Sequence, residues 1–354
     1  MKKKQLILGL LALAALVALV VWGRDKIHFD FADFRSQLAL ANWWKIAIGA
    51  GCIYLAYAFR AARWSLLLRH NKKVGLLSLM GTQVIGFTAV ALIGRIADPV
   101  RPYLVAKKTG LPLSNQFAVY IVERLFDAGS MALIFCLAIL LAPAGAMPHP
   151  ELVRKTAYWG LLLTVLGSLF LVAVRLAGGL VASLLERAFG TVSKKLGHAV
   201  GSKVRAFHTG LDTMRSFSDF AAVVSVSLGM WVLIALAYLE TAQAFVASPE
   251  LASMTPAKCV LLMVVSGGAS IVQLPVLGWF TQIGFVTAAL SKFFGAAWEP
   301  ATACAATLLL VTFLGIVPVG LIWAQFEHVS LRKITEESEH ASEELPEDET
   351  VEPA

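Results

Sequence analysis

The stretch GTQVIGFTAVALIGRIADPVRPYLVAKKTG (81–110) decides how this chain folds. Its apolar half ends at Gly94 and is shorter than the roughly 20 residues that a helix needs to cross a bilayer. Its other half holds two arginines, an aspartate, two prolines and two lysines. A plain cytoplasmic loop is the simplest interpretation. A segment that enters and leaves the membrane on one side is the alternative.

The composition of the whole chain is that of an integral membrane protein. Of its 354 residues, 58% are hydrophobic and 15% are charged, whereas a soluble domain is about half apolar and a quarter charged. The net charge of +7 does not indicate nucleic acid as a partner, because the basic residues lie between apolar runs. In that position they can face anionic lipid.

Charges at the ends of the apolar runs predict the topology, since Lys and Arg mark cytoplasmic ends. Both flanks of the 79–94 run are basic, so both are expected in the cytoplasm. The N-terminal run is longer than the roughly 7–15 residues of a signal-peptide core and is interpreted as a retained span. We expect an all-α polytopic protein with full spans at about 6–22, 45–68, 117–141, 156–176, 220–246 and 301–326.

Two further segments are predicted to be re-entrant helical hairpins. The first contains the 79–94 run and dips from the cytoplasm, and the second covers 258–294 and dips from the outside. The order span, hairpin, span then occurs twice, at about 45–142 and 220–326, in opposite orientations. This is an inverted-topology repeat, the architecture of many secondary transporters. Eight ordinary spans, two of them short, are the alternative.

The C-terminal segment differs sharply in composition from the rest. From Glu327 onward, ten acidic residues stand against Arg332 and Lys333, giving a net charge of −8 and leaving +15 on the remainder. Such a segment has little apolar surface to bury. We therefore expect one transmembrane domain over 1–330 and an acidic disordered cytoplasmic tail over 331–354, with the N-terminus also cytoplasmic.

The charged half of the opening stretch is the first candidate site. Arg95, Asp98 and Arg101 are spaced three apart, so a helical turn would place them on one face. Two guanidiniums beside one carboxylate leave a net positive site that can grip a phosphate. We expect these residues, with Tyr103, to bind a lipid head group. A topogenic loop with an internal salt bridge is the alternative.

The second candidate site is YIVERLFDAG (120–129), where three charges stand in an apolar helix. Glu123 and Asp127 share a helix face and Arg124 points away from it. Ionisable residues within a span mark a functional interior by default. Pairing of Arg95 or Arg101 with one of these acids would hold the hairpin against this helix. Charges that merely reach the membrane interface are the alternative.

The third candidate is the broken segment SGGASIVQLPVLGWFTQIGF (266–285). Interrupted helices are tolerated in membranes where they line a cavity, and a packed kink is the alternative. We expect a second half-site from Gln273, Pro275, Gly278, Gln282 and Gly284.

Catalytic and metal-binding patterns are not found in the sequence. It contains no GxSxG, HExxH, P-loop or GxGxxG motif. Its four cysteines lie scattered in apolar runs, without the spacing of a metal site or a disulfide framework. We expect no enzyme activity, no cofactor and no metal.

These motifs together resemble the lysylphosphatidylglycerol synthase transmembrane region, a flippase-like family, over about residues 5–330. The family pattern is close to G-R-x-G-E-x-x-R-P followed by V-E-R-x-x-D, and the matching residues are Gly94, Arg95, Arg101, Pro102, Glu123, Arg124 and Asp127. Ala97 and Asp98 depart from it. A later pattern, P-G-G-x-G-x-x-E, is kept at Pro275. This stretch has a glycine only at Gly278, and Gln282 replaces the glutamate.

The resemblance implies a bacterial inner-membrane protein that moves an anionic or modified phospholipid, or a lipid-linked precursor, across the membrane. Lysyl transfer is not implied, because that chemistry belongs to a separate soluble domain in the fused enzymes. The alternatives are a non-transporting scaffold for envelope-lipid enzymes and, less favoured, an intramembrane lipid-modifying enzyme. Membrane lipids are the expected partners, with homo-oligomers and envelope-lipid enzymes as further candidates.

Overall fold

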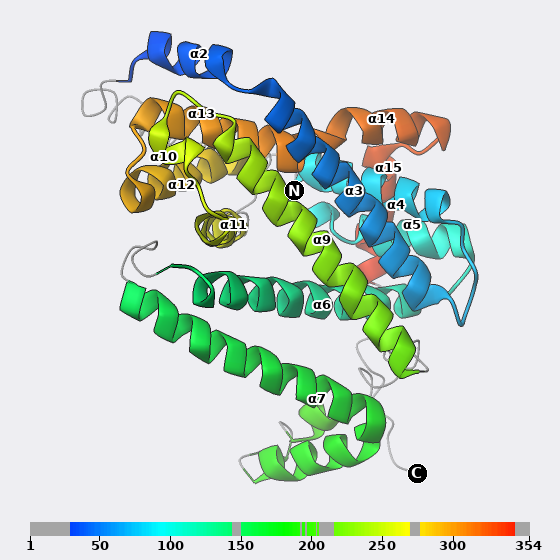
Figure 1. Cartoon of the computed structure of the whole chain (residues 1–354). Coiled ribbons are helices and arrows are strands. Elements are labelled where there is room, and N and C mark those ends of the chain that lie inside the picture. Colours follow the sequence, from blue (N-terminus) through cyan, green and yellow to red (C-terminus); the bar gives the residue numbers. More distant parts are fainter. Residues whose placement is uncertain are drawn as a thin grey trace, which may run out of the picture. The chain divides into compact units, whose positions relative to one another are not determined.

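The computed structural model describes residues 29–143, 150–191, 193, 194, 197–202, 204, 216–269 and 277–343. Over these residues the chain forms helices and no strand, as the sequence predicts (Figure 1). The elements are α2 Phe31–Leu40, α3 Trp43–Leu68, α4 Leu76–Ile93, the 3-10 turn η1 Arg95–Ala97, α5 Val100–Thr109, α6 Leu113–Leu140, α7 Pro150–Gly190, α9 Phe217–Gln243, α10 Pro249–Ala252, α11 Pro256–Ala269, α12 Leu277–Phe294, α13 Trp298–Leu309, the π turn η3 Leu310–Leu314, α14 Ile316–Phe326 and α15 Leu331–Glu343.

Within the residues that the structure describes, four helices are long and apolar enough to cross a membrane. They are Trp43–Leu68, Leu76–Ile93, Ser218–Gln243 and the continuous stretch Trp298–Phe326. Three of them coincide with predicted spans. The predicted spans 117–141 and 156–176 lie within α6 and α7, whereas the predicted span 6–22 lies outside the described residues. The membrane class is therefore shown, and the number of six spans stays a prediction.

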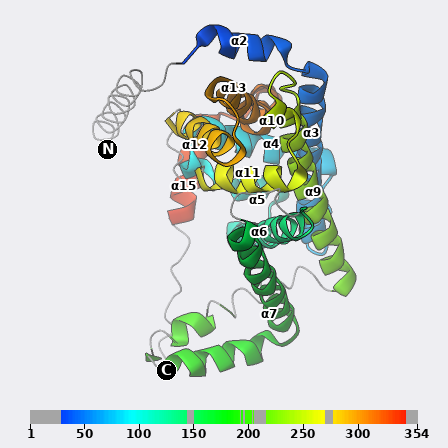
Figure 2. The ribbon, with the colours of Figure 1, turned by 60° about the vertical axis from the view of Figure 1, so that its left-hand side comes forward.

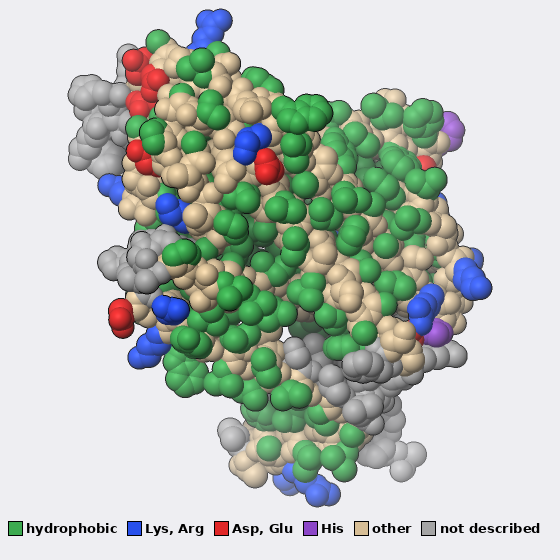
Figure 3. Space-filling view, in the orientation of Figure 1, with side chains coloured by type: hydrophobic (Ala, Val, Ile, Leu, Met, Phe, Trp, Pro, Cys, Tyr) green, Lys and Arg blue, Asp and Glu red, His purple; other side chains and the backbone are tan. Residues whose placement is uncertain are grey.

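The surface agrees with a lipid environment. Large hydrophobic side chains are exposed on several helices, among them Leu55 on α3, Leu163 on α7 and Val232 on α9. Hydrophobic side chains cover much of the face seen in the space-filling view, and few charged ones interrupt them (Figure 3). In a soluble protein so large an apolar surface would mark an interface. Here it is the surface that lipid would cover.

Helices α4 and α5 form a hairpin. Helix α4 starts at Leu76, earlier than the expected run, and reaches 18 residues. The chain reverses through Gly94, whose φ of 96° suits a residue without a side chain, and α5 ends at Gly110 in the left-handed conformation. Lys72 Nζ donates to the Thr109 carbonyl, and Lys108 Nζ donates to the Ser78 carbonyl at 3.2 Å. The two outer ends of the hairpin therefore lie together.

Helices α11 and α12 form a second hairpin. They pack against each other, and Lys258 at the start of α11 lies 5.7 Å above the Phe294 ring at the end of α12. The connecting residues 270–276, which include Gln273 and Pro275, lie outside the described residues. Both segments predicted to be hairpins are thus helix pairs with adjoining outer ends.

The described residues fall into two compact units. The first unit takes those up to Gly51 together with Ala91–Arg95 and Ala235–Gly315, and the second takes Cys52–Val90, Ile96–Ile234 and those from Ile316 on. The division falls inside α3 and α9 and just after the π turn η3. In that turn the Gly315 amide bonds the Leu310 carbonyl at 2.6 Å, five residues back, so one extra residue is accommodated within the helix.

The first unit is built around α13, which packs against α2 and α12. The start of α3 is joined there to the end of α9. Lys45 Nζ donates to Gln243 Oε1 at 2.8 Å and lies 3.5 Å from Glu240 Oε2, and the Gln243 amide donates to the Met254 carbonyl. These bonds connect segments that are far apart in the sequence.

The second unit has an apolar core drawn from most of its long helices. Its fully buried side chains include Trp64 and Leu68 from α3, Leu79 from α4, Val105 from α5 and Val223 from α9. Helix α6 packs against α5 and α7. Helix α7 runs along α6 and then continues beyond Ala177, where non-helical angles break it (Figure 2).

The chain after Glu327 differs from its predicted disorder. Residues Leu331–Glu343 form α15, which packs against α5 in the second unit. Ile334, Thr335 and Ser338 are buried, Glu336 is exposed and Glu337 is half-buried. Composition alone missed this helix because its described buried side chains include one large apolar residue. Residues 344–354 lie outside the described residues.

Candidate functional site

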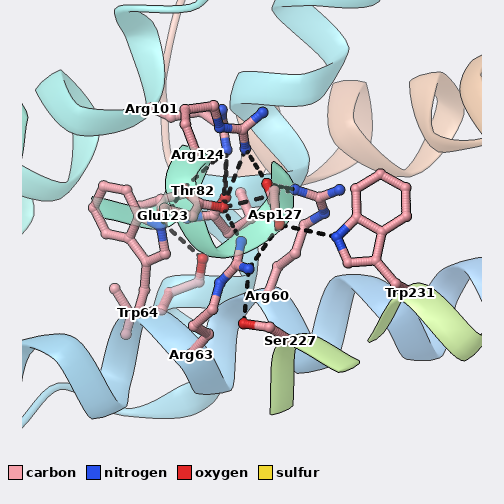
Figure 4. Close-up of polar contacts among 12 residues, drawn as sticks. Arg60, Arg63, Trp64, Thr82, Arg101, Glu123, Arg124, Asp127, Ser227 and Trp231 are labelled. Carbon is pink, nitrogen blue, oxygen red and sulfur yellow. Dashed lines mark hydrogen bonds and ion pairs between the residues drawn. The ribbon is translucent and has the colours of Figure 1, made fainter. Parts of the chain in front are cut away.

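Two carboxylates on α6 form the centre of the site. Glu123 and Asp127 are one turn apart and buried, with 0% and 6% of their surfaces exposed. Both lie in the second unit, as do all residues of the cluster around them. Arg60 and Arg63 from α3, Arg101 from α5 and Arg124 from α6 lie around this pair (Figure 4). A buried charge is costly unless it is paired, so these partners account for the position of the acids.

Arg63 from α3 bridges the two carboxylates. Its Nη2 lies 2.6 Å from Glu123 Oε1 and its Nη1 lies 2.7 Å from Asp127 Oδ1 (Figure 4). Trp64 Nε1 donates to Glu123 Oε2 at 2.6 Å, and Arg63 Nη1 also donates to Ser227 Oγ of α9 at 3.1 Å. We call Arg63, Trp64, Glu123, Asp127 and Ser227 the Arg63 network. It ties α3, α6 and α9 together with short, charge-assisted bonds.

Arg101 from α5 is held much more loosely. Its Nη1 lies 3.4 Å from Glu123 Oε2 and 3.5 Å from Gln83 Oε1, although the whole side chain is buried. Its guanidinium stacks between the Phe87 and Tyr120 rings, 4.5 and 4.9 Å from their centroids. Arg101 Nε and Nη2 and Gln83 Nε2 have no hydrogen-bond partner. We call Arg101, Gln83, Phe87 and Tyr120 the Arg101 site.

Two further arginines complete the cluster. Arg60 Nη1 lies 3.6 Å from both carboxylates, and its guanidinium lies 4.8 Å above the Phe87 ring. Arg124 Nη2 lies 3.0 Å from Asp127 Oδ2 and 3.3 Å from Glu123 Oε1. Its side chain is 39% exposed. Arg124 therefore marks the side on which the cluster reaches the surface.

The charges of the cluster do not balance. Four guanidiniums lie against the carboxylates of Glu123 and Asp127, and the Asp98 carboxylate also acts electrostatically on Arg124, which leaves a net charge of +1 at their ordinary charge states. The unpartnered atoms of the Arg101 site are all donors. Donors left unpaired in a buried site are expensive, and guanidinium matches the geometry of phosphate and carboxylate. The arrangement is suited to an anion placed against Arg101.

The comparison with protein families agrees with these residues. The chain matches the family described as Lysylphosphatidylglycerol synthase TM region over residues 6–321. It belongs to this family. The matched range includes the Arg63 network and the Arg101 site, and the resemblance predicted from the sequence is confirmed.

Membership of the lysylphosphatidylglycerol synthase TM-region family indicates a membrane-lipid-related function and places the chain in a membrane. The comparisons found no match among curated proteins and none among solved structures. The finer function therefore depends on the site itself.

The structure brings together some of the residues singled out from the sequence and separates others. Among the predicted pairings of Arg95 or Arg101 with one of the two acids, Arg101 with Glu123 is present. Arg95 is exposed on η1, and Asp98 is half-buried. Tyr103 faces α15, where its hydroxyl donates to Glu337 Oε2 at 3.0 Å. Of the predicted Arg95–Asp98–Arg101–Tyr103 group, Arg101 lies in the cluster, Asp98 acts electrostatically on Arg124 of the cluster, and Tyr103 contacts α15.

Sequence reasoning missed the arginines of α3. The positive-inside rule treats Arg60 and Arg63 only as charges at the cytoplasmic end of a span, although FRAARW (59–64) sets them three apart within an apolar helix. The rule that marked Glu123 and Asp127 applies equally to them. Gln83 and Phe87 carried no comparable signal, because neutral polar and aromatic residues are common in spans.

The predicted second half-site is described in part, within the first unit. Gln282 is buried and its Nε2 donates to Ser266 Oγ at 2.8 Å, while the Tyr238 hydroxyl donates to the same oxygen at 2.9 Å. Gln282 Oε1 has no hydrogen-bond partner. Gly278 is buried and Gly284 is exposed. This group is neutral, in contrast to the cluster of the second unit.

Within the described ranges, no group of three or more His, Cys, Asp or Glu side chains is placed to hold a metal ion. Three of the four cysteines are buried and Cys52 is half-buried.

Proposed function

We propose that this chain translocates a membrane lipid whose head group carries an anionic phosphate, and that Arg101 binds that phosphate. The observation that carries the proposal is the buried excess of positive charge beside donors without partners, on Arg101 and Gln83. A phosphate has the oxygens to accept from both side chains. Its charge offsets the excess, and two parallel guanidinium bonds give it a fixed orientation.

The loose contact between Arg101 and Glu123 supports a reversible site. At 3.4 Å the pair is longer than the 2.6 Å pair of Arg63 with the same residue. A phosphate that approaches Arg101 can therefore replace Glu123 as the ion-pair partner of this guanidinium. Glu123 would remain bonded to Arg63 and Trp64. Phe87 and Tyr120 would hold the guanidinium plane in both situations, through cation–π contacts.

The neutral group in the first unit is proposed as a separate binding site for an uncharged polar group of a lipid. Gln282 Oε1 is an acceptor that a hydroxyl or amine of a lipid head group can satisfy. We propose no lysyl transfer and no other catalysis for this chain.

The placement in the membrane is part of the proposal. We infer a bacterial inner-membrane protein with both ends in the cytoplasm and with the α4–α5 and α11–α12 hairpins entering from opposite faces. The basic residues at the end of α3 and α5 support a cytoplasmic position there, by the positive-inside rule. The adjoining outer ends of each hairpin support re-entry.

A non-transporting scaffold for envelope-lipid enzymes is the second candidate. The Arg63 network favours it, because its short bonds and complete burial are what a purely structural role requires. The two candidates differ in what they demand of Arg101. A transporter needs its guanidinium free to exchange partners, whereas a scaffold needs only the fold.

Proteoliposomes separate the two candidates. We expect the wild-type chain to move labelled anionic phospholipid between leaflets, and Arg101→Gln to reduce the rate at least about tenfold, as expected for one charge-assisted bond worth more than 1.4 kcal/mol. Arg101→Lys should recover little, since it lacks the planar pair of donors. Arg35→Gln, which removes an arginine from an exposed position on α2, is the matched control. Wild-type rates equal to empty liposomes across a broad lipid panel would reject the transporter.

A further inference from the structure

A tyrosine and a lysine form a second, shallower polar site on the face of α5 opposite its buried arginine. Tyr103 and Lys107 are one turn apart, and Lys107 Nζ lies 6.0 Å from the centroid of the Tyr103 ring. Lys107 is mostly exposed. Both side chains converge on one oxygen, Glu337 Oε2 of α15, at 3.0 Å from the tyrosine hydroxyl and 3.7 Å from the lysine nitrogen. A carboxylate from the C-terminal segment therefore occupies this site.

The neighbouring lysine is engaged in the same way. Lys108 Nζ lies 2.6 Å from Glu327 Oε1, and Trp323 Nε1 donates to that same oxygen at 3.2 Å. Two consecutive lysines of α5 are thus neutralised by two acids that follow the last span. All of these residues belong to the second unit.

The docking of α15 depends on these charges more than on apolar burial. Among the side chains of α15 whose burial the structure describes, Ile334, Thr335 and Ser338 are buried. The two hydroxyls bond to their own helix, at the Leu331 and Thr335 carbonyls. One isoleucine buries little apolar area, and a helix of 13 residues is marginal by itself in water. Release of α15 from α5 should therefore also unfold it.

We propose that Tyr103 and Lys107 form a binding site for the phosphate of an anionic membrane lipid, and that α15 covers this site as a reversible internal competitor through Glu337. Lipid phosphate replaces the carboxylate, α15 leaves α5 and becomes unfolded, and the acidic residues of the segment are then repelled by the anionic surface. The committed occupant is a lipid in the membrane, because an exposed lysine beside an amphipathic tyrosine matches the head-group region.

This inference does not depend on the proposed translocation, because occupancy of the site is read from the order of α15. Hydrogen–deuterium exchange is measured over 331–343 in the full chain, in nanodiscs of phosphatidylcholine and of an equal phosphatidylcholine–phosphatidylglycerol mixture. We expect slow exchange in the first and exchange accelerated by roughly two- to fivefold in the second, the size expected for loss of exposed ion pairs.

Variants assign the effect to the site. Glu337→Gln should exchange fast already in phosphatidylcholine, and Tyr103→Phe with Lys107→Gln should exchange fast in both lipids without a response to phosphatidylglycerol. Glu151→Gln removes the same charge from an exposed position on α7, away from α15, and should behave as wild type. Exchange over α6 in the same samples reports whether each variant is folded.

Three outcomes would overturn the proposal. They are equal exchange of wild-type α15 in the two lipids, an unchanged lipid response in the Tyr103–Lys107 variant, and an equal response to inorganic phosphate added to phosphatidylcholine nanodiscs. The last outcome would show a general anion effect and not a lipid site. Lipid transport is not read in this experiment, so its failure leaves the proposed function standing.

Discussion

At the scale of single residues, Arg63 and Arg101 illustrate how two arginines beside one carboxylate differ. Arg63 has partners at 2.6 and 2.7 Å on two acids, whereas Arg101 meets Glu123 at 3.4 Å and keeps donors without partners. The first is expected to hold the fold and the second to bind a ligand. Their substitution should therefore affect different measurements.

Replacing Arg63 should destabilise the protein. Arg63→Met leaves Glu123 and Asp127 buried without their shortest partner, and breaking a buried pair in this way costs roughly 3–5 kcal/mol. The free energy of unfolding is measured by titration with a denaturing detergent and followed by circular dichroism. Arg35→Met, at an exposed position, should change it by less than about 0.5 kcal/mol. Equal stability of the two variants would contradict a structural role for Arg63.

Residue-level prediction from the sequence succeeded where a charge stood in an otherwise apolar helix. Glu123 and Asp127 were found in this way, and the same signal at Arg63 was assigned to topology instead. Gln83 could not be predicted as a site residue from the sequence, because only the fold shows that its amide faces a buried guanidinium. Whether the head group binds where the sequence indicates stays a prediction.

At the scale of elements, close packing between α4 and α5 sets the position of Arg101. A Cβ added at Gly86 would overlap Arg101 Cγ and lie 3.2 Å from its Cδ. The absence of a side chain at Gly86 leaves room for the Arg101 side chain to lie along α4. The Arg101 site therefore depends on the packing of the two helices of the hairpin.

Gly86→Ala should impair transport without unfolding the protein. The new methyl displaces the Arg101 side chain, and a misplacement of this kind is expected to lower the lipid flux at least about tenfold, while alanine favours the helix by up to about 1 kcal/mol. Flux is measured in proteoliposomes together with thermal stability. Gly129→Ala on α6, where an added Cβ meets nothing within 4 Å, is the control. Normal flux in a stable Gly86→Ala protein would contradict the Arg101 site.

Helices were predicted well where both the length of an apolar run and its flanking charges indicated them, and less well where one of these signals was missing. The hairpin after α3 was located, but α4 gains residues at its start because LLSLM (76–80) continues the apolar helix. Helix α15 was missed because its order depends on pairing with α5. A contact made across more than 200 residues leaves no local trace in composition.

At the scale of the whole molecule, the two hairpins predict a labelling pattern. Single cysteines at Lys73 and Lys107, at the outer ends of the first hairpin, should react with a membrane-impermeant maleimide from one side only. Cysteines at Ser253 and Lys292, at the ends of the second, should react only from the other side. Inside-out and right-side-out vesicles are compared, and the unmodified chain with its half-buried Cys52 gives the background.

A labelling pattern that differs from this prediction would show which part of the predicted topology is wrong. Labelling of Lys73 and Lys107 from different sides would make α4 a full span, which its length permits, and would remove the inverted repeat. Labelling of all four positions from one side would keep the hairpins and reverse the inferred orientation of the second.

The membrane class and the family were predictable from the sequence, because the composition and the paired motifs each combine information from many residues. The division into two units was not, because it cuts α3 and α9 within their helices. Apolar periodicity shows where a helix runs and does not show which neighbours each half contacts. The inverted repeat stays a prediction for the same reason.

The π turn between α13 and α14 has a consequence for chain length in the last span. The π turn η3 contains one residue more than a regular α-helical turn. Removing that residue would leave a regular α-helix in which the residues after the turn point in the same directions as before. Gly320 in α14, where an added Cβ would overlap Thr88 Oγ1, is kept at its contact in this way. A one-residue deletion inside η3 is therefore compatible with that contact, whereas a deletion within α14 before Gly320 would turn the glycine by roughly 100° away from it. Related chains are free to differ in length at this turn, and alignments that ignore it will place the residues that follow out of register.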